Sequence, residues 1–282
     1  MTDPIINVDE LIAYDGPIGI ADVRWYLDQP THGHFAYHAG HIPEAVYLNL
    51  EVHLSDSNGP GRHPLPTRQA FAATMEGIGF GQEQLIVAYD DRGGATAARL
   101  WWMLRDIGHD SVRVLDGGIA AWQSAGQAIE TDLPTHDPAT MTVRRSTTRQ
   151  LDRDELSSRL GAVTLLDARE PARYRGEEEP IDPVAGHIPT ALSASMLDNL
   201  AEDETFLGAE QLRERFARLG VDADRDTVVY CGSGVTACHN ALAMVRAGLP
   251  DPILYPGSWS DWSATGGAVA LGAEPGEVAS SQ

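Results

Sequence analysis

The sequence predicts an α/β protein with two tandem domains, each a parallel sheet flanked by helices. Three observations lead to this fold class. The chain has 282 residues, which is above the size at which a single hydrophobic core usually stops growing. Its second half repeats motifs of its first half in the same order. Within each half, short apolar runs alternate with helix-like segments, which is typical of parallel strands joined by crossover helices.

The repeat is visible in four pairs of segments. They are "AGHIPEA" at 39–45 with "AGHIPTA" at 185–191, "DVR" at 22–24 with "DAR" at 167–169, "LIVAYDDRGGATAARLWWML" at 85–104 with "TVVYCGSGVTACHNALAM" at 227–244, and "LDGGIAAW" at 115–122 with "YPGSWSDW" at 255–262. One long period, repeated once, indicates a duplicated domain rather than a solenoid. We therefore place the domains at 1–135 and 151–282, joined by a polar linker at 136–150 that is rich in Thr and Arg.

The second half illustrates the alternation of strands and helices. Its apolar runs "VTLLDA" at 163–168, "TVVY" at 227–230 and "PILYPG" at 252–257 predict strands, and the segments 152–160, 208–220 and 235–248 predict helices. Ligands of open α/β sheets bind beyond the carboxyl ends of the strands. The residue that follows the strand at 227–230 is Cys231, so this edge of the sheet is where we expect the functional site.

Cys231 stands where a strand ends and a helix begins. Gly232 and Gly234 permit a tight turn, and from Val235 onward the apolar residues recur at helical spacing. The amides of such a loop and the positive end of the helix dipole favour the thiolate over the thiol. The pattern therefore predicts a nucleophile or an anion cradle, the alternative being a small buried residue that happens to follow a strand.

The first half supplies a comparison for this loop. Its segment reads "DRGGAT", and alignment on Thr96 and Thr236 places Asp91 at the position of Cys231. The loop is kept and the thiol is absent. We therefore expect the second domain to carry the chemistry and the first domain to lack it.

Composition excludes several classes of protein. A net charge of −21 argues against nucleic acid and anionic membrane surfaces as partners, and no apolar run approaches the length of a membrane span. No secretory signal is visible, and two cysteines without a CxxC pair predict neither a disulfide framework nor a cysteine-based zinc site, which suits the reducing cytoplasm. The prediction includes no metal and no cofactor.

Taken together, these motifs resemble the tandem-domain rhodanese family of sulfurtransferases over nearly the whole chain. The loop "CGSGVT" is similar to that of the 3-mercaptopyruvate sulfurtransferases, whereas relatives that act on thiosulfate typically carry a basic loop of the form CRKGVT. The resemblance implies that Cys231 takes a sulfur atom from a small donor, becomes a persulfide, and passes the sulfur to cyanide or to a thiol acceptor such as thioredoxin or a small thiol. It implies 3-mercaptopyruvate as the donor, with thiosulfate as the alternative.

The resemblance also assigns roles to individual residues. It implies that the anionic sulfur is stabilised by the backbone amides of Gly232, Gly234, Val235 and Thr236. It implies that Ser233 and the "GHIP" histidine His41 transfer a proton, with Asp28 as a third member of this group. It also implies that Arg173 binds the substrate carboxylate. The family often has a second arginine nine residues after the first, and this chain has Asp182 there. Arg175 or Arg62, in the loop "GPGRHPLP", is the expected substitute.

Several conspicuous residues are expected to be structural. Arg24 and Arg169 follow strand-end aspartates in both halves, which predicts ion pairs with Asp22 and Asp167. His187 is expected to brace its domain, and Cys238 to pack in the core.

Two rival functions fit the sequence less well. A Cdc25-like phosphatase of the same fold needs an arginine at the end of its loop, where this chain has Ala237. A persulfide carrier without turnover is the other, and the intact duplication argues against it.

Overall fold

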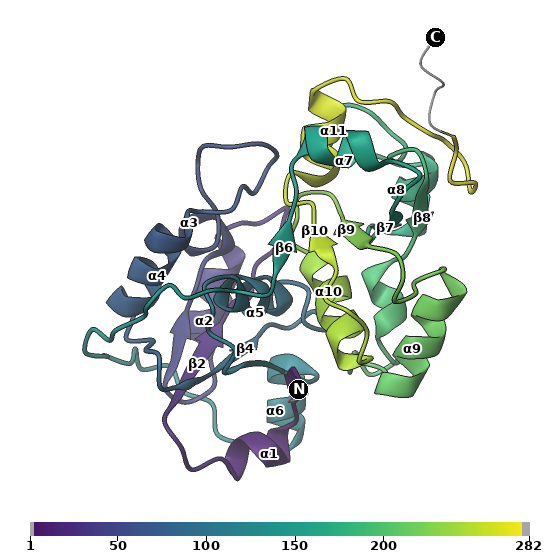
Figure 1. Ribbon diagram of the computed structural model, residues 1–282. Coiled ribbons are helices and arrows are strands. Elements are labelled where there is room, and N and C mark those ends of the chain that lie inside the picture. Colours follow the sequence, from purple (N-terminus) through teal and green to yellow (C-terminus); the bar gives the residue numbers. More distant parts are fainter. Residues whose placement is uncertain (1–2, 278–282) are drawn as a thin grey trace. The chain divides into compact units, whose positions relative to one another are not determined.

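The structure is a computed structural model that describes residues 3–277 and divides into two compact units (Figure 1). The first unit comprises the residues up to Asp56 together with Leu65–Thr147 and Ala201–Phe206. The second comprises Ser57–Pro64, Thr148–Leu200 and the residues from Leu207 onward. No helix within residues 3–277 has both the length and the apolar character that crossing a bilayer requires.

Each unit contains one sheet and its flanking helices. The first unit runs β1 (Ile5–Ile6), α1 (Val8–Ile12), β2 (Ile18–Asp22), α2 (His32–Ala39), β3 (Ala45–Tyr47), α3 (Leu50–His53), α4 (Arg68–Gly77), β4 (Leu85–Tyr89), α5 (Ala97–Asp106), β5 (Val112–Leu115) and α6 (Gly118–Ser124). The second runs β6 (Arg149–Gln150), α7 (Arg153–Arg159), β7 (Thr164–Asp167), α8 (Pro171–Arg175), β8 (Ala191–Ser193), a 3-10 helix η1 (Met196–Asn199), α9 (Ala209–Arg218), β9 (Thr227–Tyr230), α10 (Ala237–Arg246), β10 (Ile253–Leu254) and α11 (Ser258–Ala264).

The two sheets have the same topology. Among the described residues, the strand orders are β1-β5-β4-β2-β3 and β6-β10-β9-β7-β8, and every pairing between these strands is parallel. The central strands also share a register, because Asp22 pairs with Tyr89 in the first sheet and Asp167 pairs with Tyr230 in the second. Two five-stranded parallel sheets with flanking helices confirm the predicted fold class and the duplication.

The secondary structure predicted for the second half is also confirmed. The apolar runs form β7, β9 and β10, and the three helix-like segments form α7, α9 and α10. Figure 1 shows α10 running beside β9 and β10 within this unit. The sequence pattern did not predict α8, because its five residues are too few to display a helical period.

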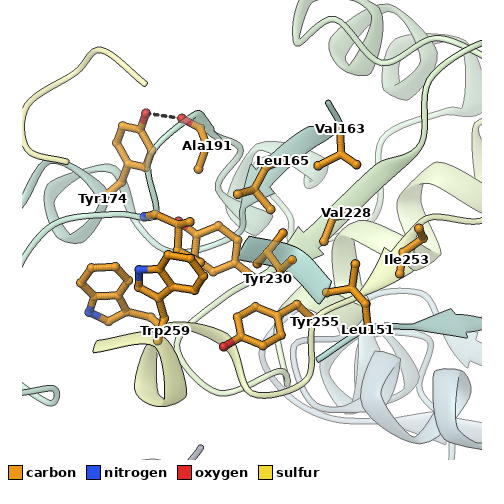
Figure 2. Close-up of a cluster of buried hydrophobic side chains, with 13 residues drawn as sticks. Leu151, Val163, Leu165, Tyr174, Ala191, Val228, Tyr230, Ile253, Tyr255 and Trp259 are labelled. Atoms are coloured by element: carbon orange, nitrogen blue, oxygen red, sulfur yellow. Dashed lines mark hydrogen bonds between the residues drawn. The ribbon is translucent and has the colours of Figure 1, made fainter. Parts of the chain in front are cut away.

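The core of the second unit forms around β9. Figure 2 shows the aliphatic side chains of Leu165, Val228 and Ile253 grouped on one side and the rings of Tyr230 and Trp259 on the other. All five side chains are buried. Each strand of a buried parallel sheet packs on both faces, which explains why β7 and β9 read as continuous apolar runs. This packing fixes the carboxyl end of β9, where Cys231 follows.

Two segments depart from the domain boundaries suggested by the sequence. Residues 57–64 belong to the second unit, where the main-chain N–H of Arg62 donates to Ser260 Oγ at 3.0 Å. Residues 201–206 belong to the first, where the N–H of Phe206 donates to the carboxylate of Asp116 at 2.8 Å. A boundary drawn from composition cannot place such segments, since each is held by bonds to residues far away in sequence.

The predicted linker also differs from the structure. Residues up to Thr147 belong to the first unit, and the main-chain N–H of Arg144 donates to the carbonyl of Ile107 at 2.8 Å. Arg149 already pairs with Ile253 in the second sheet. The polar composition of this segment reflects exposed side chains on a backbone that is hydrogen-bonded to folded structure.

Candidate active site

Each strand end is held by the same buried ion pair. Arg24 binds Asp22 with Nη2 to Oδ2 at 2.6 Å, and Arg169 binds Asp167 with the same atoms at 2.7 Å. Both pairs are almost inaccessible to solvent, and each arginine also donates to the carbonyl of the glycine in its "GHIP" motif. These bonds satisfy charges that would be costly to bury alone, and they confirm the predicted structural ion pairs.

The thiol of Cys231 lies inside its loop. Cys231 is 2% exposed, and the N–H of Gly234 donates to its Sγ at 3.1 Å. Its own N–H donates to Ser258 Oγ at 3.1 Å, and its carbonyl accepts from the N–H of Trp259 at 2.9 Å. The backbone on both sides of the sulfur is therefore fixed, and an amide points at the sulfur itself. Such a contact stabilises a sulfur anion more than a neutral thiol.

The two glycines of the loop are required for different reasons. Gly234 has φ +77°, and a Cβ at this position would lie 2.4 Å from the carbonyl oxygen of Pro256. A Cβ on Gly232 would lie 3.2 Å from Arg62 Nη2 and 3.5 Å from Arg173 Nη1. Gly234 therefore allows the turn, whereas Gly232 leaves room for two guanidinium groups beside the loop. Val235 is buried, and Thr236 stands at the N-cap of α10.

Arg62 and Arg173 share one buried carboxylate. Asp182 Oδ1 accepts from Arg62 Nη1 at 2.8 Å, and Asp182 Oδ2 accepts from Arg173 Nη2 at 3.3 Å. Glu179 accepts from Arg173 at 2.6 Å and from Arg169 at 3.2 Å. This hydrogen-bonded chain holds the two arginines of the loop region in place.

Part of each guanidinium stays available for a ligand. Within residues 3–277, Arg62 Nε is buried without a hydrogen-bond partner, and neither Arg62 Nη2 nor Arg173 Nη1 has one. Arg175 differs from them, because it pairs at the surface with Glu177 at 2.7 Å. Of the arginines proposed from the sequence, the structure brings Arg62 and Arg173 to the loop, whereas the guanidinium of Arg175 bonds to Glu177 instead.

His63 is a site residue that the sequence analysis missed. Its Nδ1 lies 2.8 Å from Ser233 Oγ, and both side chains are buried. The two residues are 170 positions apart in the sequence, and no local pattern links them. The imidazole can exchange a proton with the serine hydroxyl in this arrangement, which lies two residues from the thiol.

His41 and His187 occupy equivalent positions in their own units. His41 places Nδ1 2.9 Å from the carbonyl of Tyr37 and Nε2 3.1 Å from that of Asp132. His187 places the same atoms 2.8 Å and 3.1 Å from the carbonyls of Tyr174 and Glu274. Each ring stacks on its tyrosine, and burial raises the pKa of both tyrosines to about 12. The geometry gives the two histidines the same bracing contacts. Proton transfer by His41 stays a prediction.

The equivalent loop of the first unit corrects one residue of the sequence alignment. The carbonyl of Asp90 accepts from the N–H of Ile119 as that of Cys231 accepts from Trp259, and Asp90 follows Tyr89 as Cys231 follows Tyr230. Asp90, not Asp91, therefore stands in place of the cysteine. The first loop is one residue longer than the second. Alignment on Thr96 and Thr236 therefore shifts the match at the strand end by one residue, from Asp90 to Asp91.

The Asp90 carboxylate occupies the centre of its loop. Its two oxygens accept from the amides of Arg92, Gly94, Thr96 and Ala97 at 2.8–2.9 Å. Asp91 instead accepts a hydrogen bond from the hydroxyl of Tyr26. The loop of the first unit therefore binds an anionic group, and that group is a side chain of the protein.

Cys238 and Trp259 are both buried. Cys238 is on α10, where its Sγ contacts the carbonyl of Gly234 at 3.4 Å. Trp259 is fully buried and packs its ring against the Arg169 guanidinium at 4.7 Å. Asp28 is exposed, and no hydrogen bond joins it to His41 in the described part of the chain.

Comparison with known proteins agrees with this architecture. The model of the rhodanese-like domain matches twice, at residues 7–125 and 152–265. The crystal structure of SseA from Escherichia coli, described as a 3-mercaptopyruvate sulfotransferase with the rhodanese fold, superposes with a TM-score of 0.80. It is 31% identical, and the match covers 92% of this chain and 100% of that one.

Two curated relatives carry names with different donors. A Pseudomonas aeruginosa protein with the name of a 3-mercaptopyruvate sulfurtransferase is 45% identical over 251 residues, which are 86% of this chain and 88% of that protein. A Mycobacterium tuberculosis protein, SseB, with the name of a thiosulfate sulfurtransferase is 44% identical over 258 residues, which are 90% of both chains. The two similarities are nearly equal, so the donor has to be argued from the site.

Proposed function

Because the chain belongs to the rhodanese-domain family of 3-mercaptopyruvate and thiosulfate sulfurtransferases, we propose that it takes its sulfur from 3-mercaptopyruvate. The observation that carries this proposal is the position of Arg62 Nη2 and Arg173 Nη1 beside Gly232, one residue from the nucleophile. Two guanidinium edges suit a carboxylate, which accepts one hydrogen bond on each oxygen. The donor's reactive sulfur is then two carbon atoms away from its charge and can reach Cys231.

The first half-reaction moves one sulfur atom. The Cys231 thiolate attacks the sulfur of 3-mercaptopyruvate, a sulfur–sulfur bond forms, and the carbon–sulfur bond breaks. The products are the Cys231 persulfide anion and pyruvate. The proton that leaves the donor thiol has to reach the methyl carbon of pyruvate, because that carbon keeps the electron pair of the broken bond. The amide of Gly234, now 3.1 Å from Sγ, stabilises the anionic sulfur during the step.

We propose that Ser233 and His63 move this proton. Their side chains are in hydrogen-bond contact at 2.8 Å, and Ser233 belongs to the loop that holds the thiol. An imidazole exchanges protons at neutral pH, and the hydroxyl extends its reach toward the donor. This assignment replaces His41 as the proposed partner, because both ring nitrogens of His41 contact main-chain carbonyls.

The second half-reaction regenerates the free Cys231 thiolate. A thiolate acceptor or cyanide attacks the outer sulfur of the persulfide, and the Cys231 thiolate leaves. With cyanide the product is thiocyanate. A small thiol or a thioredoxin-type dithiol is the acceptor class that we propose in the cell, because either supplies a thiolate nucleophile.

Thiosulfate is the second candidate donor. Its support is the similarity to the Mycobacterium tuberculosis relative and the presence of two cationic groups near the loop. Thiosulfate releases sulfite, which needs no proton and carries two negative charges next to the reacting sulfur. The loop residues Gly232 to Thr236 contain no cationic side chain to receive that charge. This difference favours 3-mercaptopyruvate.

Initial rates with each donor test the proposal, with cyanide as acceptor and thiocyanate as the measured product. We expect a higher kcat/KM for 3-mercaptopyruvate than for thiosulfate. Arg173→Ala should raise the KM for 3-mercaptopyruvate by about 10- to 100-fold, because hydrogen bonds to a charged group contribute roughly 1.5–3 kcal/mol. Arg175→Ala is the matched control, since it removes a half-buried arginine two residues away that pairs with Glu177, and should leave KM unchanged. A kcat/KM for thiosulfate that equals or exceeds that for 3-mercaptopyruvate would overturn the donor assignment.

A further inference from the structure

Asp182 is a buried carboxylate at the place where the proposed donor binds. Its side chain is 4% exposed, and its two oxygens contact two different arginines, Arg62 at 2.8 Å and Arg173 at 3.3 Å. Both of those arginines also lie beside Gly232. The carboxylate therefore bonds to one nitrogen of each guanidinium group, Arg62 Nη1 and Arg173 Nη2. The nitrogens proposed to bind the donor are the other two, Arg62 Nη2 and Arg173 Nη1.

The charges around this pair are balanced. One connected network contains three arginines and three carboxylates: Arg62, Arg169, Arg173, Asp167, Glu179 and Asp182. Its formal charge is zero. Two arginines beside a nucleophile would ordinarily attract a dianion, but here each one already has an internal counter-ion. The charge that a donor meets is set by the acidic residues behind the arginines as well as by the arginines.

We propose that Asp182 determines the donor charge that the site accepts, and that it selects monoanions over dianions. The inference rests on the proposed function, because it places the donor's anionic group at Arg62 and Arg173. A monoanionic carboxylate needs only the two open guanidinium edges and adds one negative charge to a neutral network. A dianion adds two negative charges and loses more hydration, so its burial beside Asp182 is disfavoured.

Asp182 also positions the arginines, and this second role has a different signature. Since one oxygen bonds to each guanidinium, the carboxylate fixes their spacing. Loss of spacing would weaken the binding of every anion. Loss of the negative charge would strengthen anion binding, and it would strengthen the binding of dianions most. The sign of the effect separates the two roles.

Protection of Cys231 from alkylation by iodoacetamide tests the inference without turnover. Iodoacetamide is neutral, so its own binding does not depend on the site charge. Pyruvate serves as the monoanion and sulfate as the dianion, and each is titrated at constant ionic strength. In the wild-type protein, pyruvate should slow alkylation at a lower concentration than sulfate does. This comparison needs no variant.

The variant Asp182→Asn keeps the shape of the side chain and removes its charge. We expect the half-protecting concentration of sulfate to fall at least 10-fold and that of pyruvate to fall less than 3-fold. The matched control is Glu177→Gln, which removes one negative charge from the same segment, where Glu177 is exposed and pairs with Arg175. It should shift neither anion by more than 2-fold, because solvent screens an exposed charge.

Several results would overturn the inference. They are equal shifts for both anions in Asp182→Asn, weaker protection by both, no shift, or the same selective shift in Glu177→Gln. If Asp182→Asn does not fold, preferential protection of the wild type by sulfate would contradict the inference by itself. The outcome is separable from the donor assignment, because a site that binds pyruvate before sulfate but turns over thiosulfate faster would refute the proposed donor and leave the role of Asp182 intact.

Discussion

The loop after β4 and the loop after β9 leave their sheets at the same register, yet one surrounds a carboxylate and the other a thiol. In the first, four amides bind the oxygens of Asp90. In the second, the Gly234 amide contacts the sulfur of Cys231. Both loops therefore use backbone N–H groups to hold a negatively charged or polarisable atom at the end of a strand.

The difference between the loops lies in what surrounds them. The Asp90 carboxylate is buried and makes its hydrogen bonds with its own loop, so its role is structural. Cys231 has two guanidinium groups next to its neighbour Gly232 and a histidine bonded to Ser233. The two copies of the loop therefore share their backbone architecture, and they differ in the cationic and titratable side chains that lie beside the second one.

Replacing His63 tests the chemical half of the comparison. His63→Ala should lower the rate of sulfur transfer from 3-mercaptopyruvate by about 10²- to 10⁴-fold, the usual contribution of a general acid–base group. Transfer from thiosulfate should change much less, because sulfite leaves without a proton. Single-turnover kinetics with both donors would measure the effect.

Ser233→Ala provides the control for that result. If serine and histidine act as one relay, the double variant should be no slower than the slower single variant. Equal losses with the two donors would contradict the relay and would indicate that His63 only supports the loop.

Replacing Asp90 tests the structural half. Asp90→Asn removes the charge and leaves two amides facing an NH₂ group, which should destabilise the first unit by about 3 kcal/mol or more. For a domain of this size, that loss lowers the thermal midpoint by roughly 6–12 °C. Calorimetry measures the midpoint, and donor kinetics well below it should be unchanged. A stable variant that transfers sulfur slowly would reverse the roles that we assign to the two loops.

A smaller effect is expected from pH. Burial lowers the pKa of His109 in the first unit, where its neutral ring accepts from Gln82 and contacts the carbonyl of Ser111. The unfolded chain therefore takes up this proton at a higher pH than the folded chain. Stability is complete above pH 6.5 and falls as the pH drops below it, by at most about 1.4 kcal/mol per pH unit for this one group.

His109→Gln should flatten that dependence, measured as the thermal midpoint between pH 7 and pH 5. The exposed His136→Gln serves as the reference variant. A slope that is unchanged in His109→Gln and reduced in the reference variant would place the acid sensitivity elsewhere.

The repeat explains what the sequence could and could not predict. Features present in both halves could be predicted from the pattern, including the strand-end ion pairs and the parallel sheets. Features present in one copy mark the candidate site, and Cys231 and Arg173 were predicted there because the first half does not repeat them. His41 does not meet this criterion, because His187 repeats it. His63 meets it but is one of several unmatched histidines, so the repeat alone does not select it.

The sequence did not predict contacts between residues that are far apart in the chain. The contacts of Arg62 with Asp182 and of His63 with Ser233 join residues 120 and 170 positions apart. Neither pair leaves a local signal, because loop geometry brings them together. The alignment of Cys231 with Asp91 instead of Asp90 has a similar origin. The sequence of a glycine-rich loop does not indicate where one extra residue is inserted, and only the strand register shows which aspartate is equivalent to Cys231.

The most direct test of the account is the location of the transferred sulfur. The wild-type protein is treated with one equivalent of 3-mercaptopyruvate without an acceptor, and its peptides are analysed by mass spectrometry. We expect the added mass of one sulfur atom on the peptide that contains Cys231, located on Cys231 rather than Cys238. Cys231→Ser should fold normally and gain no sulfur. Sulfur bound to Cys238, or a sulfur-loaded Cys231→Ser protein, would show that Cys231 is not the sulfur carrier.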